Sequence, residues 1–380
     1  MFFFIEKIKK NIQGTILDTY LRIFICYISR IYYKNVNKIK TIEFDKCLII
    51  LYGGMGDSIL LFPLINNLSK KHNLDIMIED KFFEITSLLD SKINFIKYKK
   101  NEIFKTLINY KKKNKKFILL QQSPIFEFLI FNFLLGRPAV VGFIYNQKIL
   151  NIEGLNKQIS LDTALNKIKK YHLFFHFISK HVKLISFKCK KNITSGKKLS
   201  KIYKNYFVLA PSKTSTWNGV GILENSVYID IIDYICRNSK LTPILVGSKD
   251  DLPMVNNLLK NLPQRLKFKN LVGKTNLQQL IQIIKKANFV ISNDNGIHHL
   301  SNYLNKKTLT FFTFSSCEAL KWDNRNSHFI FNKKYNCMPC VGNKTGPFDN
   351  YPFQCPWKIR CKNSITSNLA IKKIEKIKLI

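Results

Sequence analysis

Short apolar runs alternate with stretches of helical spacing along the first half of the chain. Five runs predict buried β-strands, at residues 47–51, 74–78, 93–98, 117–120 and 139–142. The first of them ends at a group of glycines, which is typical of a strand that enters a tight turn. Helical spacing predicts helices over 59–68 and 126–135, with another between the third and fourth strands. This alternation indicates a parallel sheet covered by helices.

The second half repeats the alternation more clearly. We expect strands at residues 206–210, 242–246, 289–292 and 308–312, and helices at 227–237, 251–262, 277–286 and 298–304. A lysine-rich, weakly patterned segment at 183–204 separates the halves and is interpreted as an interdomain linker, or as a solvated surface stretch. Two βα arrays in 380 residues predict an α/β protein with two lobes.

The predicted organisation has four parts. They are a basic, aromatic-rich helical region at 1–45, a Rossmann-like domain at 46–190, a second Rossmann-like domain at 205–335 and a cysteine-containing extension at 336–380. The first forty residues show no secretory cleavage site, and no run there reaches the roughly 18 apolar residues of a membrane-spanning helix. The N-terminal region is expected either to pack on the first domain or to lie on an anionic membrane face.

Composition limits the protein class without naming a ligand. A hydrophobic content of 46% supports globular cores and excludes wholesale disorder. The formal net charge of +38 fits attraction to an anionic partner, but the joint abundance of Lys, Ile, Asn and Phe also fits the bias of an AT-rich genome. Nine cysteines, five of them scattered, favour a reducing cytoplasm over a disulfide framework.

Two polar loops follow predicted strands, where ligands bind in open α/β sheets. The first is Tyr-Gly-Gly-Met-Gly-Asp-Ser at 52–58, in which Gly53, Gly54 and Gly56 allow close backbone approach to a ligand. Asp57 is expected at or near the N-terminus of the next helix, either as a catalytic carboxylate or as a helix cap. The loop lacks the third glycine of the dinucleotide fingerprint.

The second loop is Ser-Asn-Asp-Asn-Gly-Ile-His-His at 292–299. The backbone N–H groups of Asn295, Gly296 and Ile297 are expected to hold a diphosphate at a helix N-terminus. Asp294 is expected to accept hydrogen bonds from sugar hydroxyls, and one of the two histidines that end the loop to face the ligand, although a helical histidine is more often simply packed.

A third segment, Ala-Pro-Ser-Lys-Thr-Ser-Thr-Trp at 210–217, follows the first strand of the second half. The hydroxyls of Ser212 and Thr214 and the ammonium group of Lys213 suit phosphate oxygens. Trp217 is expected to anchor the loop.

In this order the three segments resemble glycosyltransferase family nine, the ADP-heptose:lipopolysaccharide heptosyltransferases. The stretches that carry the resemblance are residues 48–63, 209–217 and 271–299. The resemblance implies the α/β GT-B fold, two facing Rossmann-like domains with the active site between them, and an inverting reaction that needs no metal. Asp57 matches the family's catalytic aspartate, a general base on the acceptor hydroxyl. Asp294, Gly296 and His299 match its donor-binding turn.

Two positions depart from the family pattern. Ser215 stands where the family often has a lysine, and Lys213 is a candidate substitute. Asn295 stands where the donor turn usually has threonine, which leaves the identity of the sugar open.

The resemblance also implies the partners. They are a nucleotide-diphosphate sugar, ADP-heptose in the family, and an anionic glycolipid acceptor such as the lipopolysaccharide core. The expected location is the cytoplasm, peripheral at the inner face of the cytoplasmic membrane. The alternatives are a GT-B transferase for another nucleotide sugar in surface polysaccharide synthesis, and a non-catalytic basic anion-binding protein on a degenerate transferase fold. No nucleic-acid motif is recognised, so no nucleic-acid partner is expected.

Four cysteines cluster near the C-terminus, at Cys337, Cys340, Cys355 and Cys361. The first pair has the spacing of a zinc knuckle, whereas the second pair is more widely spaced than usual. Structural zinc and free or redox-active thiols both remain open. No cofactor is expected to be required for catalysis.

Overall fold

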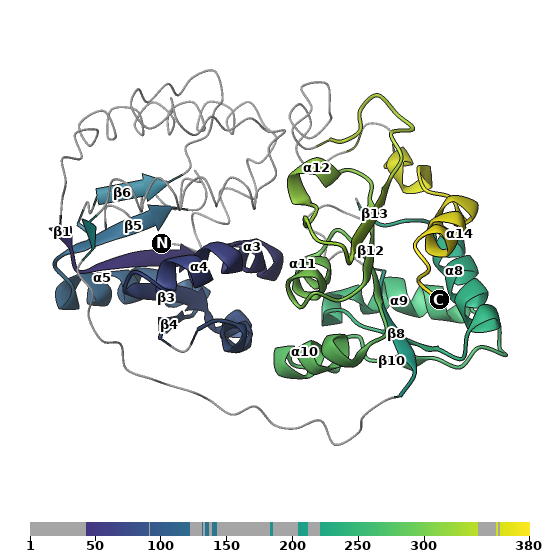
Figure 1. Ribbon diagram of the computed structural model, residues 1–380, viewed down its shortest axis with the longest axis horizontal. Helices are drawn as coiled ribbons and strands as arrows, with labels where there is room; N and C mark the ends of the chain where they lie inside the picture. The colour runs from purple at the N-terminus through teal and green to yellow at the C-terminus, as the bar shows by residue number, and fades with distance from the viewer. Residues whose placement is uncertain are drawn as a thin grey trace. The chain divides into compact units, whose positions relative to one another are not determined.

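The computed structural model describes residues 43–90, 92–121, 131, 134–136, 139–142, 183–184, 204–211, 221–340, 355 and 358–380. The chain divides into two compact units, Met1–Thr194 and Ser195–Ile380 (Figure 1). The predicted N-terminal helical region lies almost wholly outside the described residues, and so does most of the helix predicted at 126–135. In the part of the chain that is described, no helix is long and apolar enough to cross a membrane.

The first unit contains a parallel sheet of five strands in the order β4-β3-β2-β5-β6. Its strands are β2 (Lys46–Leu51), β3 (Leu74–Glu79), β4 (Asn94–Tyr98), β5 (Phe117–Gln121) and β6 (Ala139–Gly142). All five predicted strands are confirmed. The helices are α3 (Met55–Leu60), α4 (Phe62–Ser69) and α5 (Ile103–Lys113), with 3₁₀ segments at Asp80–Leu88 and Lys100–Glu102.

The first unit also contains a separate parallel sheet of two strands. It joins β1 (Glu43–Phe44) to β7 (Lys183–Leu184). The segment at 183–204 was interpreted as a linker, so this interpretation is wrong for its first two residues, which pair with another strand.

The second unit contains a parallel sheet of six strands in the order β10-β9-β8-β11-β12-β13. Its strands are β8 (Tyr206–Ala210), β9 (Thr242–Leu245), β10 (Lys269–Asn270), β11 (Val290–Asn293), β12 (Thr308–Phe312) and β13 (Ser327–Phe331). Its helices are α8 (Asn225–Asn238), α9 (Leu252–Lys260), α10 (Leu277–Lys286), α11 (Gly296–Tyr303), α12 (Cys317–Leu320) and α14 (Ser367–Lys376), with 3₁₀ segments at Lys249–Asp251 and Arg360–Asn363.

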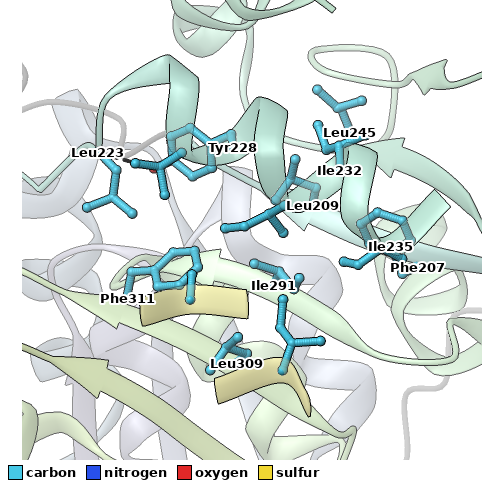
Figure 2. Packing of buried hydrophobic residues seen from close by; sticks show 14 of the residues in the cluster. Phe207, Leu209, Leu223, Tyr228, Ile232, Ile235, Leu245, Ile291, Leu309 and Phe311 are labelled. Atoms are coloured by element: carbon cyan, nitrogen blue, oxygen red, sulfur yellow. Dashed lines mark hydrogen bonds between the residues drawn. The ribbon is translucent and has the colours of Figure 1, made fainter. Parts of the chain in front are cut away.

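The core of the second unit forms because α8 presents one apolar face to the sheet. Ile231, Ile232 and Ile235 recur at helical spacing and are fully buried. They pack against apolar side chains of the strands, among them Leu209 and Ile291 (Figure 2). The C-terminal helix α14 packs on α8 and adds to the same core. This rigid layer supports the loops at the carboxyl ends of the strands.

In each sheet, successive strands are first added on one side of the starting strand and then, after a reversal, on its other side. In the first unit the reversal falls between β2 and β5, and in the second between β8 and β11. In open parallel sheets, ligands bind outside the carboxyl ends of the strands at this switch point. The loops that follow β2, β8 and β11 are the three segments selected from the sequence, so the topology places each of them where a ligand is expected.

Candidate active site

The glycine-rich loop after β2 leads directly into α3. The residue before the helix is Gly54, so both Gly56 and Asp57 lie in the first helical turn. The sequence analysis had placed Gly56 in the turn before the helix, and this prediction is wrong. Asp57 is exposed, and its Oδ2 accepts a hydrogen bond from the Gly54 N–H over 3.4 Å. An acidic side chain in the first turn is stabilised by the helix dipole. The carboxylate is thus positioned locally while staying accessible to solvent.

Gly53 fits this turn only because it has no side chain. Its φ of +132° is a conformation that other residues rarely adopt, and a Cβ atom built there would lie 3.3 Å from Oδ2 of Asp57. The close approach of the backbone to the carboxylate therefore depends on glycine at this position.

The turn after β11 is capped by its own asparagine. Oδ1 of Asn295 accepts hydrogen bonds from the N–H groups of Ile297, at 2.9 Å, and His298, at 3.0 Å. The Ile297 N–H is thus used inside the turn in this structure, and its expected role in holding a diphosphate stays a prediction. Asn295 therefore caps the N-terminus of α11, a role that the threonine usual in the family at this position can also fill.

Three polar side chains tie this turn to the end of β8. The Asn295 amide donates to the carbonyl of Ala210 over 3.3 Å, and the Asn293 amide donates to the carbonyl of Pro211. The hydroxyl of Tyr228, buried in α8, lies 2.9 Å from the Pro211 carbonyl and 2.8 Å from Oδ1 of Asn293. The carboxyl ends of β8 and β11 are thus joined at the switch point.

The other three predicted donor-binding residues, Ser212, Lys213 and Thr214, lie outside the described residues. They directly follow Pro211, whose carbonyl is held by the contacts just described. Their roles stay predictions.

The two adjacent histidines of α11 differ in their contacts. His298 is almost fully buried, and its Nδ1 lies 2.7 Å from the Thr310 hydroxyl and 3.0 Å from the Asn302 amide. Its Nε2 lies 3.4 Å from the carbonyl of Leu320. Both ring nitrogens of His298 therefore have protein partners. His298 thus has the packing role that the sequence analysis gave as the alternative to facing a ligand.

His299 contacts the donor turn instead. Its Nδ1 accepts a hydrogen bond from the indole N–H of Trp322 over 3.2 Å, and its Nε2 lies 3.8 Å from Oδ1 of Asp294. Oδ2 of Asp294 accepts a hydrogen bond from the Ser315 hydroxyl over 2.6 Å. Sequence reasoning found Asp294 and His299 but missed Ser315 and Trp322. Ser315 follows β12 as Asp294 follows β11, and this was the available signal.

Asp294, His298 and His299 also have the composition of a metal site. One ligand atom from each lies within 4.8 Å of the others, and all three residues are buried. Both nitrogens of His298 and Nδ1 of His299 are already occupied by protein partners, so a cation would have to displace these contacts. Each of the three side chains is thus held by neighbouring residues of the protein, with His299 and Asp294 3.8 Å apart.

The four C-terminal cysteines lie close enough to affect one another. Burial, followed by the charges of the other three cysteines, raises the pKa of Cys340 to about 12. Burial and the charges of Cys355 and Cys337 likewise raise the pKa of Cys361 to about 12. Among the described residues, no three of these sulfur atoms form a group whose members all lie within 4.8 Å of one another, so the ligand spacing of a metal centre is not seen here.

The comparisons with known proteins agree with this arrangement. The two parallel sheets with their covering helices, together with the structural matches that follow, confirm the predicted α/β GT-B fold class. The structure matches Escherichia coli ADP-heptose LPS heptosyltransferase II with a TM-score of 0.61 and 15% identity, over 87% of this chain and 98% of that chain. It matches E. coli heptosyltransferase WaaC with ADP with a TM-score of 0.61 and 14% identity, over 88% of this chain and 100% of that chain.

The family resemblance is confirmed as well. Residues 225–351 match the model of glycosyltransferase family 9 (heptosyltransferase). Lipooligosaccharide heptosyltransferase 2 of Campylobacter jejuni is 29% identical over 115 residues, which are 30% of this chain and 33% of the relative. The chain thus aligns with about a third of the length of this curated relative, and the matched family region includes β11, α11 and the donor turn.

Proposed function

We propose that this protein is a glycosyltransferase that moves a sugar from a nucleotide-diphosphate donor, ADP-heptose in the first instance, to a lipopolysaccharide or lipooligosaccharide core. The observation that carries the proposal is the donor turn at Asp294–Gly296, which lies at the switch point of β8 and β11 inside the matched family region. Solved relatives of the same fold include one described with ADP and one with ADP-2-deoxy-2-fluoro heptose.

The proposed mechanism is a direct displacement with inversion. Asp57 takes the proton of the acceptor hydroxyl, whose oxygen forms a bond to the anomeric carbon of the sugar. The bond from that carbon to the diphosphate oxygen breaks, and the nucleoside diphosphate leaves with the electron pair. Ser212, Lys213 and Thr214 would stabilise the negative charge of the leaving group, and Gly296 leaves space for it at the start of α11. No metal ion takes part in this step.

The proposed acceptor is an anionic glycolipid at the inner face of the cytoplasmic membrane. The net charge of +38 supports attraction to phosphorylated acceptors and to an anionic membrane surface. If the protein were instead a non-catalytic anion binder, it would bind nucleotide and polyanions alike, and it would release both steeply as salt concentration rises.

A nucleotide screen tests the donor assignment. We expect ADP and ADP-heptose to raise the melting temperature, because a ligand that binds only the folded state at about 100 times its Kd adds roughly 2.7 kcal/mol of stability. UDP- and GDP-sugars serve as the comparison, and Asp294→Ala serves as the variant control for the sugar-dependent part of the ADP-heptose shift. A shift with a UDP- or GDP-sugar alone would reassign the nucleotide, and no shift with any of them would overturn the donor site.

We further propose that Cys337, Cys340, Cys355 and Cys361 hold a structural metal ion, with zinc as the first candidate. The burial of Cys337, Cys340 and Cys361 in one cluster supports the proposal, and so does the Cys-Met-Pro-Cys spacing of the first pair. Iron is the second candidate, since a solved relative of this fold is described as the iron-containing dodecameric glycosyltransferase TibC from enterotoxigenic E. coli, with a TM-score of 0.53 and 15% identity, over 89% of this chain and 77% of that chain.

Metal binding is expected to release protons. Cys340 and Cys361, with pKa values of about 12, hold their protons at neutral pH in the metal-free protein, whereas metals bind thiolates. The affinity for Zn²⁺ should therefore rise with pH. Calorimetry in buffers of different ionisation enthalpy measures the released protons, and elemental analysis of the purified protein identifies the metal. The proposal is wrong if Cys361→Ser loses no more metal or stability than Cys236→Ser, a half-buried cysteine in α8.

A further inference from the structure

The carboxylate of Asp294 is held from a segment far from it in sequence. Both partners come from the stretch that follows β12 and contains α12, which lies near α11 (Figure 1). Ser315, which is 3% exposed, donates to Oδ2 of Asp294 over 2.6 Å. Trp322 reaches the other carboxylate oxygen through His299. The four side chains Trp322, His299, Asp294 and Ser315 thus lie in series, with hydrogen bonds at both ends and a 3.8 Å approach between His299 and Asp294.

The indole contact determines which nitrogen of His299 carries the proton. An indole N–H can only donate, so Nδ1 of His299 has to accept. A neutral imidazole then has its proton on Nε2, the nitrogen that lies 3.8 Å from Oδ1 of Asp294. The indole of Trp322 therefore acts on the carboxylate through His299, because it leaves the imidazole proton on Nε2, the nitrogen nearer to Asp294.

We propose that Ser315 and Trp322 are positioning residues that orient the Asp294 carboxylate toward the hydroxyl groups of the donor sugar. The inference rests on the proposed function, in which Asp294 binds the donor. A carboxylate accepts hydrogen bonds from hydroxyls but repels a diphosphate, so it serves the sugar rather than the nucleotide. Ser315 donates to one carboxylate oxygen, Oδ2, and Nε2 of His299 lies 3.8 Å from the other, Oδ1.

Two variants remove one contact each. Ser315→Ala deletes the hydroxyl, and Trp322→Phe deletes the indole N–H but keeps an aromatic ring. Ser301→Ala is the matched control, because its hydroxyl is fully buried on the same helix as His299 and has no hydrogen-bond partner among the described residues. Kd values for ADP and for ADP-heptose, and KM and kcat for transfer, are measured for the wild-type protein and all three variants.

We expect ADP to bind each variant within about twofold of wild type, because the carboxylate that these residues position repels a diphosphate and is proposed to bind the sugar. The Kd for ADP-heptose should rise about tenfold or more in Ser315→Ala, the size of a lost hydrogen bond to a charged group, and by a smaller factor in Trp322→Phe, which loses only a hydrogen bond to His299. Ser301→Ala should behave as wild type. Equal weakening of ADP and ADP-heptose, or no difference from Ser301→Ala, would overturn the inference.

A spectroscopic measurement separates positioning from simple packing. In protein with ¹⁵N-labelled histidine, the ring shifts of His299 should report a single tautomer protonated on Nε2 in the wild type and a mixture in Trp322→Phe. A wild-type His299 protonated on Nδ1 would overturn this inference but would leave the proposed function standing. If the wild-type protein binds neither ADP nor ADP-heptose, the proposed donor site fails, and this inference fails with it.

Discussion

Asp57→Asn is expected to lower kcat for sugar transfer by about 10²- to 10⁴-fold, the usual contribution of a general base. The amide keeps the size and shape of the side chain but cannot take the proton of the acceptor hydroxyl. The helix should remain intact, because the side-chain oxygen of asparagine can still accept the Gly54 N–H, and Asp57 is exposed. Steady-state kinetics with ADP-heptose and a lipopolysaccharide-core acceptor, together with a melting curve, measure both effects.

Asp80→Asn is the matched control for this experiment. Asp80 also follows a strand of the first sheet, β3, and it is exposed, but it pairs with Lys97 at 3.5 Å and has no proposed role in transfer. Its replacement should leave kcat unchanged. A kcat for Asp57→Asn within about twofold of wild type would exclude residue 57 as the general base and would favour the non-catalytic alternative.

Most of the fold follows from local patterns in the sequence. Strands such as β2 and β8 are continuous apolar runs buried on both faces, and helices such as α8 have one clear apolar face, so both are visible without tertiary information. The missed strands lack this signal. β10 is only two polar residues long, and β13 alternates weakly, so both form because a neighbouring strand offers its edge.

The candidate site was predictable where function and topology coincide. Asp57 and the turn at Asp294–Gly296 follow strands at the switch points, and the rule that ligands bind there is enough to select them from the sequence. The position of Ser315 after β12 was a signal that could have selected it, but Trp322 carried none, because its contact is with a residue 23 positions away in sequence. The start of α3 at Met55 was missed because glycines suggest a turn, whereas here Gly56 lies inside the helix.

Tyr228→Ala is expected to destabilise the second unit by about 3–5 kcal/mol, the usual effect of truncating a buried aromatic side chain. Tyr228 is fully buried and packs against Phe311 in the core shown in Figure 2. Its hydroxyl accepts the N–H of Leu223 over 3.2 Å and lies within hydrogen-bond distance of Pro211 and Asn293, so the truncation also leaves buried polar groups without this partner. A thermal or denaturant melt measures the loss.

Tyr228→Phe separates the hydroxyl from the ring. We expect it to cost about 1–3 kcal/mol, the effect of leaving buried hydrogen-bonding groups unsatisfied, and to weaken ADP binding because the hydroxyl joins the ends of β8 and β11. Tyr206→Phe is the control, since its buried hydroxyl donates to the carbonyl of Ile283 in α10 over 2.7 Å. Equal effects of the two variants on ADP affinity would show that Tyr228 stabilises the core without organising the donor site.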